Sequence, residues 1–251
     1  MWNLVMSSDR QRARRENERT PPGEQRKLIL LGASRNSADI LDVVDAINRT
    51  PGRQTYECLS LLDDKESLWG TTIAGRRVLG SLASARECSE AWFVNGIGSP
   101  SSFWKKDEII ARSGVPLERF ATLVHPAASV SATSEVGPGT VIFQNVTIGS
   151  GARIGKHVLI CPGAVVSHDC IVGDYTCIAS SVSIAGDVRV GSLCYLGMSC
   201  AVRERVEIGN GSLLGMGSVV LRNVAENSVV VGNPARYLRV RDLSERNDGQ
   251  A

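Results

Sequence analysis

Three histidines, at positions 125, 157 and 168, are the side chains of this sequence that most readily exchange a proton near neutral pH. An imidazole in this pKa range can act as a general base and take a proton from an attacking amine or hydroxyl. His168 is followed directly by Asp169, and Gly186 lies eighteen residues further along the chain. Taken alone, His168 could equally be a solvated surface residue. Its interpretation depends on the elements that hold it.

A six-residue period dominates the chain from residue 130 onward. Every sixth position is Val, Ile or Leu through sixteen consecutive blocks, from Val130 to Val220, with no insertion. The residue four positions after each of these is small or β-branched, from Ser134 to Val224. A fixed short period of this kind indicates a solenoid built from repeated units.

Each block predicts one short strand and one corner, so three blocks make a triangular coil of eighteen residues. Sixteen blocks give about five coils, and a strand spacing of about 4.8 Å gives a prism roughly 25 Å long. The aliphatic column fills the interior beside the small column, where Cys170, Cys194 and Cys200 are expected to act as small apolar residues. Glycines that follow many aliphatic positions are expected to relieve the backbone at the bends. In this register His168 faces outward directly under Gly186, whose N–H a ligand carbonyl can approach.

Residues 27–122 follow a different pattern, in which apolar strands alternate with helices. The expected strands are Lys27–Leu31, Cys58–Leu62 and Ala91–Val94, and the expected helices are Ala38–Asn48 and Asp107–Ser113. This order predicts a small parallel sheet. Residues 1–26 are polar and contain a Pro-Pro-Gly run, which indicates a disordered tail, and residues 241–251 are expected to form a second tail.

The body of the chain is electrically balanced. The net charge is +2, and residues 1–27 hold seven Lys/Arg against four Asp/Glu, which leaves 21 against 22 elsewhere. A basic excess confined to one tail gives no reason to expect a nucleic-acid partner. No run of 18 apolar residues occurs, so no membrane span is expected. Seven cysteines without a CxxC pair, and a beginning without an apolar leader, favour reduced thiols in the cytoplasm.

Three strings make the sequence similar to one family. These are His125-Pro126, the run from Val166 through His168 to Asp174, and Val231-Gly232-Asn233-Pro234-Ala235. Together with the repeat, they resemble the hexapeptide-repeat sugar O/N-acyltransferases, which include sialic acid O-acetyltransferases and nucleotide-amino-sugar N-acetyltransferases. The resemblance covers about 210 residues. It implies a Rossmann-like acceptor-binding domain over 27–122 and a left-handed parallel β-helix, the acetyltransferase domain, over 123–240.

The resemblance also implies an activity and its residues. The expected reaction is acetyl transfer from acetyl-CoA to an amino or hydroxyl group of a sugar, without a metal, in a homotrimer. His168 matches the family's general base, and Asp169 matches the acid that orients its ring. The expected acetyl-CoA-binding residues are Gly186, Met198, Gly215, Met216, Asn233 and Pro234. The expected acceptor-binding residues are Ser34, Asn36, Asp63 and Asp64.

The sequence departs from the family at three positions. Asn36 stands where related proteins often have the histidine of a Gly-His-Gly run, Cys161 where many have Asn, and Cys177 where several have a second histidine. Two of these positions belong to acceptor recognition in the amino-sugar enzymes. The identity of the acceptor, the choice between N- and O-acetylation and the length of the acyl donor therefore stay open.

Other interpretations make different demands on the sequence. A dinucleotide-binding domain needs three spaced glycines, but no glycine follows Gly32 before Gly52. A zinc enzyme on the same fold needs three converging histidines, but His157 and His168 are eleven residues apart and do not stack; His157 is instead expected on the surface. A non-catalytic scaffold, or an acyltransferase with a non-sugar acceptor, is compatible with the repeat. The scaffold would not need the His-Asp pair.

Overall fold

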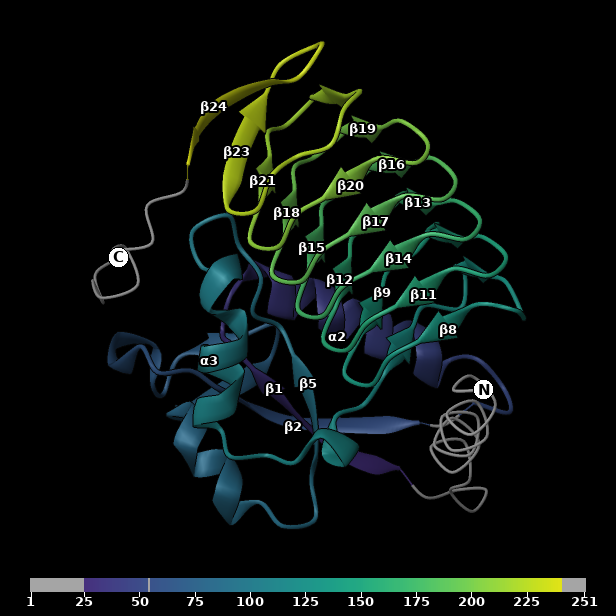
Figure 1. Ribbon diagram of the computed structural model, residues 1–251. Helices are drawn as coiled ribbons and strands as arrows, with labels where there is room; N and C mark the ends of the chain where they lie inside the picture. The colour runs from purple at the N-terminus through teal and green to yellow at the C-terminus, as the bar shows by residue number, and fades with distance from the viewer. Residues whose placement is uncertain (1–24, 54, 241–251) are drawn as a thin grey trace, which may run out of the picture.

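The computed structural model describes residues 25–53 and 55–240, which form an α/β unit followed by a long β-helix (Figure 1). Of the tail expected over 1–26, only residues 25 and 26 are described, and Arg26 already belongs to the first strand. The tail expected over 241–251 lies outside the described residues. Within the described part of the chain, no helix is long and apolar enough to cross a membrane.

The α/β unit is built on a five-stranded sheet with the strand order β3-β4-β2-β1-β5. The strands are β1 (Arg26–Leu31), β2 (Tyr56–Leu62), β3 (Thr72–Ile73), β4 (Arg76–Gly80) and β5 (Trp92–Asn95). Neighbouring strands are parallel except for the antiparallel pair β3 and β4. The three expected strands are confirmed, while the β3–β4 hairpin was not predicted from the sequence.

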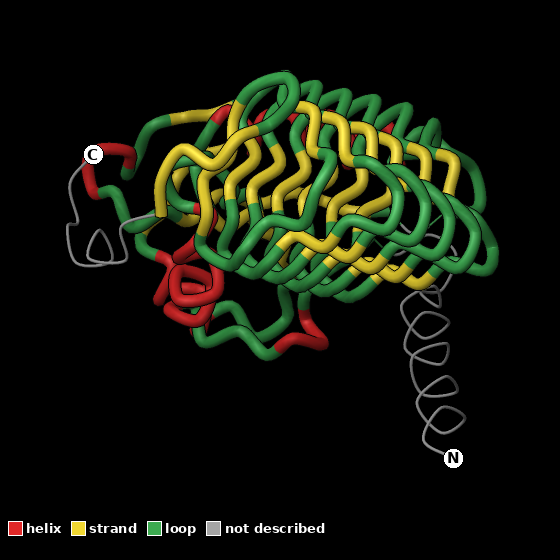
Figure 2. The backbone as a smooth tube through the Cα atoms, turned by 45° about the horizontal axis from the view of Figure 1, so that its top comes forward, coloured by secondary structure: helices red, strands yellow, loops and turns green. Residues whose placement is uncertain are grey.

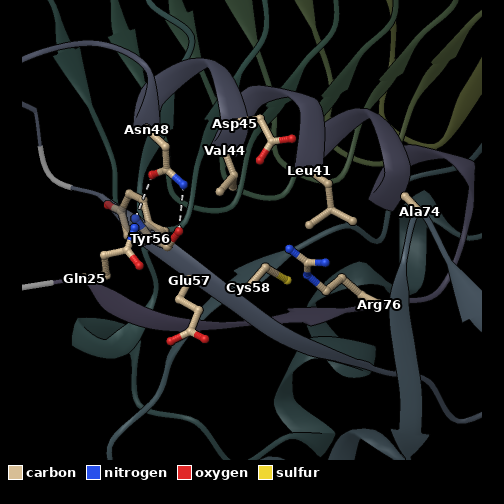
Figure 3. Close-up of a pocket in the computed structure, with 10 residues that line it drawn as sticks. All are labelled: Gln25, Leu41, Val44, Asp45, Asn48, Tyr56, Glu57, Cys58, Ala74 and Arg76. Atoms are coloured by element: carbon tan, nitrogen blue, oxygen red, sulfur yellow. Dashed lines mark hydrogen bonds between the residues drawn. The ribbon is translucent and has the colours of Figure 1, made fainter.

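Two α-helices and four short 3-10 helices complete this unit. They are α2 (Arg35–Asn48), α3 (Lys106–Arg112), η1 (Glu66–Leu68), η2 (Leu82–Glu87), η3 (Phe103–Lys105) and η4 (Leu117–Arg119). Ile40, Val44 and Ile47 recur at helical spacing on α2 and are buried. Figure 3 shows α2 with β2 on one side and strands of the β-helix on the other. Its apolar residues therefore join the two units through one continuous core.

The β-helix has three faces, each a stack of parallel strands that are two residues long except at the C-terminal end of face 1 (Figure 2). Face 1 contains β6 (Leu123–Val124), β9 (Val141–Ile142), β12 (Leu159–Ile160), β15 (Cys177–Ile178), β18 (Tyr195–Leu196), β21 (Leu213–Leu214) and β23 (Ser228–Val231), with β24 (Arg236–Val240) antiparallel at its end. Face 2 contains β7 (Ser129–Val130), β10 (Thr147–Ile148), β13 (Val165–Val166), β16 (Ser183–Ile184), β19 (Ala201–Val202) and β22 (Val219–Val220). Face 3 contains β8 (Glu135–Val136), β11 (Arg153–Ile154), β14 (Ile171–Val172), β17 (Arg189–Val190) and β20 (Glu207–Ile208).

The two columns of the repeat both point into the prism. The aliphatic residue is the second residue of each strand from β7 to β22, and nearly all of these side chains are buried. The small column is buried as well, including Cys170, Cys194 and Cys200, each fully inaccessible. Burial of one aliphatic side chain stabilises the fold by about 1.5–3 kcal/mol. The predicted parallel β-helix is confirmed, and its stacked strands are consistent with the expected left-handed form.

The repeated glycines serve a different purpose from the one expected. Those at the first turn position, such as Gly149 and Gly173, do not have a positive φ; the left-handed residues lie two positions later. A methyl group on Gly173 would lie 2.5 Å from the backbone of the next coil. These glycines therefore allow adjacent coils to approach closely, while the bend itself occurs at the third turn residue.

Candidate active site

His168 lies on the edge between face 2 and face 3, which we call the second corner (turns 131–134, 149–152, 167–170, 185–188, 203–206 and 221–224). Its Nδ1 is 3.0 Å from Oδ2 of Asp169. Both side chains are largely exposed, at 59% and 62%. Backbone hydrogen bonds to the coils on either side fix the pair: Asp169 N–H donates to Ser150, and Asp187 N–H donates to the His168 carbonyl. An Nδ1 proton held by the carboxylate leaves Nε2 free to accept a proton.

Gly186 lies directly against the His168 ring, as the eighteen-residue register predicted. A Cβ at position 186 would be 2.5 Å from both Nε2 and Cε1 of His168. Only glycine therefore allows the ring to lie where it does. The Gly186 N–H has no hydrogen-bond acceptor among the described residues. One corner thus combines a base oriented by a carboxylate with an adjacent unpaired amide donor.

The other expected acetyl-CoA-binding residues lie on the edge between face 1 and face 2, which we call the first corner (turns 125–128, 143–146, 161–164, 179–182, 197–200 and 215–218). Met198 and Met216 are 49% and 75% exposed there. Gly215 lies under Val231, where a methyl group would be 2.7 Å from its Cγ1. The segment containing exposed Asn233 and Pro234 is anchored beside them by hydrogen bonds from Gly232 to Ser218 and from Ala235 to Val219.

The structure therefore divides the predicted site between two corners. Face 2 separates the two corners. Each coil crosses this face with about six residues, so the distance between the corners is at most about 20 Å at 3.3 Å per residue. Gly186 lies with His168 at the second corner, while Met198, Gly215, Met216 and the 233–234 segment form a separate group at the first. The sequence register could place each residue on a corner, but the grouping becomes visible only in three dimensions.

The expected acceptor-binding residues lie at the carboxyl ends of β1 and β2, close to face 1. Asn36 Nδ2 donates to the Gly98 carbonyl at 2.8 Å. Asp63 accepts hydrogen bonds from the N–H groups of Ala33 (2.7 Å) and Lys65 (2.8 Å). Ser34 directly precedes α2, and its N–H lies 3.3 Å from the Ser37 hydroxyl. Three of the four residues thus gather at one edge of the sheet.

Asp64 faces a different neighbour. One of its oxygens accepts the Leu82 N–H at 2.9 Å, and the other is 3.2 Å from Arg112 of α3. The carboxylates of Asp63 and Asp64 both hold the loops of the unit together. A ligand bound at these residues would share carboxylate oxygens that already accept hydrogen bonds from the chain.

The expectation that His157 lies on the surface is wrong. It lies on the third corner (turns 137–140, 155–158, 173–176, 191–194 and 209–212), beneath the α/β unit, and is 2% exposed. Its ring contacts Phe120 edge-on at 4.5 Å and stacks on Tyr175 at 5.3 Å. Burial lowers the pKa of His157 to about 3. The repeat gave no signal for this, because η4 and the segment after it supply the cover.

A pocket of about 290 Å³ opens at the opposite end of the α/β sheet (Figure 3). It is lined from the second half of α2, the start of β2 and the β3–β4 turn, including Asp45, Glu57 and Arg76. None of the predicted site residues lines it. In α/β proteins ligands bind at the carboxyl ends of the strands, and this pocket lies at the amino ends of β1 and β2. We therefore place the candidate site at the corners.

No group of three or more His, Cys, Asp or Glu side chains suitable for a metal ion occurs within residues 25–53 and 55–240. The described histidines lie at separate places, since His125 follows β6, His157 is buried and His168 is at the second corner. The expectation of a reaction without a metal stays a prediction.

Residues 151–186, which contain both His168 and Gly186, match the family model for the bacterial transferase hexapeptide with six repeats. The chain carries the hexapeptide transferase repeat. The search of curated proteins found no match to this sequence.

Several solved structures have the same fold over most of the chain. The acetyltransferase domain of PglB from Neisseria gonorrhoeae has a TM-score of 0.74 at 24% identity, over 85% of this chain and 100% of that one. PerB from Caulobacter crescentus, in complex with CoA and GDP-perosamine, has a TM-score of 0.72 at 23% identity, over 85% and 97%. WeeI from Acinetobacter baumannii has a TM-score of 0.72 at 24% identity, over 85% and 100%. The resemblance to hexapeptide-repeat sugar acyltransferases is thus confirmed at the level of the repeat and the fold.

Proposed function

We propose that this protein is an acetyl-CoA-dependent acetyltransferase acting on an amino or hydroxyl group of a nucleotide-linked sugar. The observation that carries the proposal is the second corner, where His168, Asp169 and Gly186 form one contact. The proposal is supported by structural neighbours that bind the expected ligands: the PglB domain was solved with acetyl coenzyme A, and PerB with CoA and GDP-perosamine.

In the proposed reaction, Nε2 of His168 takes the proton from the acceptor as it attacks the thioester carbonyl. Asp169 fixes the tautomer by accepting a hydrogen bond from the Nδ1–H group, and it stabilises the imidazolium that forms. Such a base contributes about 10²–10⁴-fold to the rate. The carbonyl oxygen gains negative charge, which the Gly186 N–H stabilises; one donor of this kind contributes about 10²–10³-fold in kcat. The tetrahedral intermediate then collapses, the CoA thiolate leaves, and the His168 proton neutralises it.

We propose direct transfer, without an acetylated cysteine. Cys170 is the thiol nearest to His168 in the sequence, but it is buried inside the prism with Sγ 3.0 Å from the Ala185 carbonyl. Burial raises the pKa of Cys170, and it raises the pKa of Cys161 and of Cys200 to about 12. Thiols with raised pKa values supply little thiolate for nucleophilic attack.

We further propose a homotrimer, with acetyl-CoA bound between adjacent prisms. Within one chain the first corner cannot reach His168 without crossing face 2. A cyclic arrangement can place the first corner of one copy beside the second corner of the next, and a threefold ring closes the set. Met198, Gly215, Met216, Asn233 and Pro234 would then hold the CoA whose thioester reaches His168 and Gly186 of the neighbour.

The α/β unit over 27–122 is the proposed Rossmann-like acceptor domain, and 123–240 the proposed acetyltransferase domain. Ser34, Asn36 and Asp63 lie at the carboxyl ends of its strands, the usual position for a nucleotide in parallel sheets. Asp64 is the next residue in the chain. We infer that the nucleotide of the acceptor binds there, with its sugar directed toward the β-helix.

The test is a panel of UDP-, GDP-, dTDP- and CMP-linked sugars incubated with acetyl-CoA, with release of the CoA thiol as the readout. At least one acceptor should give enzyme-dependent release. Acetyl-CoA alone should raise the melting temperature, because it binds the native state. If acetyl-CoA produces no shift and no acceptor releases thiol, the proposal is wrong.

A further inference from the structure

A buried lysine lies between the α/β unit and face 1 of the β-helix. Lys106, the first residue of α3, is 0% exposed, and its Nζ is 3.6 Å from Sγ of Cys177 on β15. Cys177 is 2% exposed. No carboxylate lies within ion-pair distance of Lys106 in the described part of the chain. The thiol is thus the polar partner that the structure gives this amine.

This environment favours the neutral, nucleophilic form of the amine. Burying an ammonium without a counter-ion is strongly unfavourable, because its hydration is lost. Burial therefore lowers the pKa of Lys106. A neutral amine has a lone pair available for bond formation, and the amine and the thiol are held almost in contact.

The contact is built into the fold. Gly98, after β5, lies against both groups: a methyl group there would be 2.8 Å from Cys177 Sγ and 3.9 Å from Lys106 Nζ. Asn36 holds Gly98 in place through a hydrogen bond to its carbonyl. A larger residue at position 98 would displace the thiol. Residues from three separate parts of the chain therefore keep the amine and the thiol together.

We propose that Lys106 and Cys177 form a reversible oxidative cross-link in which one oxygen atom joins Nζ to Sγ. The oxidant is molecular oxygen, and the reaction is R–NH2 + R′–SH + O2 → R–NH–O–S–R′ + H2O. Nitrogen and sulfur each lose two electrons, and O2 gains four. One oxygen atom enters the bridge. The other leaves as water, which takes one hydrogen from the amine and one from the thiol. Dithiothreitol supplies the four electrons for the reverse reaction.

The cross-link would join α3 to β15 and so fasten the α/β unit to the β-helix. It joins two residues that are 71 positions apart in the chain. Closing a loop of this length restricts the unfolded chain and stabilises the native state. The consequence is an oxygen-dependent rigidity at the junction of the two units. This inference rests on the junction alone and does not depend on the proposed function.

The test compares full-length protein kept in dithiothreitol with protein exposed to oxygen-saturated buffer, each denatured and alkylated before mass spectrometry. The oxidised sample should gain about 14 Da, one oxygen less two hydrogens, before alkylation is counted. Six of the seven thiols should then react with the alkylating reagent, because one is in the bridge. Trypsin should fail to cleave after Lys106, and a peptide joining Lys106 to Cys177 should appear. Dithiothreitol should reverse each of these changes.

The variants identify the atoms. Lys106→Met and Cys177→Ser should each abolish the mass gain, while Cys161→Ser, at a half-buried neighbouring thiol, should retain it. Oxidation should raise the wild-type Tm by about 10 °C, and the Tm of Lys106→Met should not change. Seven reactive thiols after oxidation would overturn the proposal. A loss of about 2 Da that requires both Cys161 and Cys177 would show a disulfide and would overturn it equally. The wild-type peptide map decides the matter even if a variant folds poorly.

Discussion

At the scale of single residues, the second corner shows how a repeat can hold an exposed imidazole in one orientation. His168 and Gly186 occupy the same position in successive coils, so a side chain in one coil lies against a missing side chain in the next. Asp169, beside His168, has a left-handed backbone (φ 58°) that turns its carboxylate toward Nδ1.

Replacing His168 with Ala should lower kcat by about 10²–10⁴-fold, because the acceptor proton then has no positioned base. The thermal shift caused by acetyl-CoA should stay nearly unchanged, because the imidazole acts on the acceptor. Asp169→Asn is the matched variant and should cause a smaller loss in kcat, since it keeps the size of the side chain but removes the carboxylate. Full turnover in His168→Ala would remove this residue from the mechanism.

Gly186→Ala should also lower turnover, by about 10²-fold or more, because the new methyl group displaces the His168 ring and obstructs the amide donor. Ser150, one coil before His168 in the same column, provides the control. Ser150→Ala should keep wild-type kcat, since only its backbone carbonyl contacts the pair. If Gly186→Ala kept the wild-type kcat as Ser150→Ala does, the contact between positions 168 and 186 would have no catalytic role.

His157 should make stability depend on pH. Its pKa is about 3 in the folded state and about 6.5 when unfolded, so the unfolded chain binds more protons between these values. The stabilisation is complete above about pH 6.5 and decreases as the pH falls toward 3, by at most about 1.4 kcal/mol per unit. His157→Phe should flatten the urea-midpoint profile between pH 6.5 and 4. Tyr175→Phe, the control, should keep the slope; identical slopes in wild type and His157→Phe would contradict the account.

At the scale of elements, stability depends on how closely the coils stack. Each strand contributes two residues and pairs in parallel with the strand eighteen positions away, so no single strand is stable alone. The columns of aliphatic and small residues hold the prism together from inside. The glycines at the first turn position allow the backbones of successive coils to touch.

Gly173→Ala tests this role. The methyl group would lie 2.5 Å from the backbone at Gly191 and Ser192, and such overpacking costs about 1–3 kcal/mol. Gly217→Asn is the control, since position 217 has a φ of 67° and open space, which Asn tolerates. The first variant should lower the urea midpoint and the second should leave it nearly unchanged. Equal midpoints for wild type and Gly173→Ala would show that the coils can relax apart.

At the scale of the whole molecule, the proposed function assigns the two parts of the site to different copies of the chain. The first corner carries the residues expected to hold CoA, and the second carries the residues expected to react. The α/β unit covers face 1 (Figure 1). It does not cover face 2, which lies between the first and second corners. An arrangement of copies around a threefold axis would unite the two groups.

Mixed assemblies test this arrangement. His168→Ala and Met216→Asp should each be nearly inactive, the second because a charge enters the proposed CoA groove. Unfolding and refolding the two together should restore about a quarter of wild-type activity, since a site needs an intact second corner and an intact first corner from different copies. Refolding each variant alone is the control. Activity that stays at the level of the single variants would place both groups in one subunit.

Much of the fold, and part of the candidate site, could be predicted from the local sequence pattern. The aliphatic column from Val130 to Val220 specifies the β-helix, because its period equals one side of the prism and each coil repeats the same contacts. The same register placed His168 under Gly186. Turns within one coil, and stacking at a fixed separation of eighteen residues, require no knowledge of the rest of the chain.

Contacts between distant segments are what only the tertiary structure decided. The burial of His157 under Phe120 and the contact of Lys106 with Cys177 follow from how the α/β unit lies on the β-helix. The separation of Met198 and Met216 from His168 likewise depends on which edge of the prism each residue reaches. A sequence period fixes neighbours along the stack, whereas the position of one unit on another depends on the shapes of both surfaces.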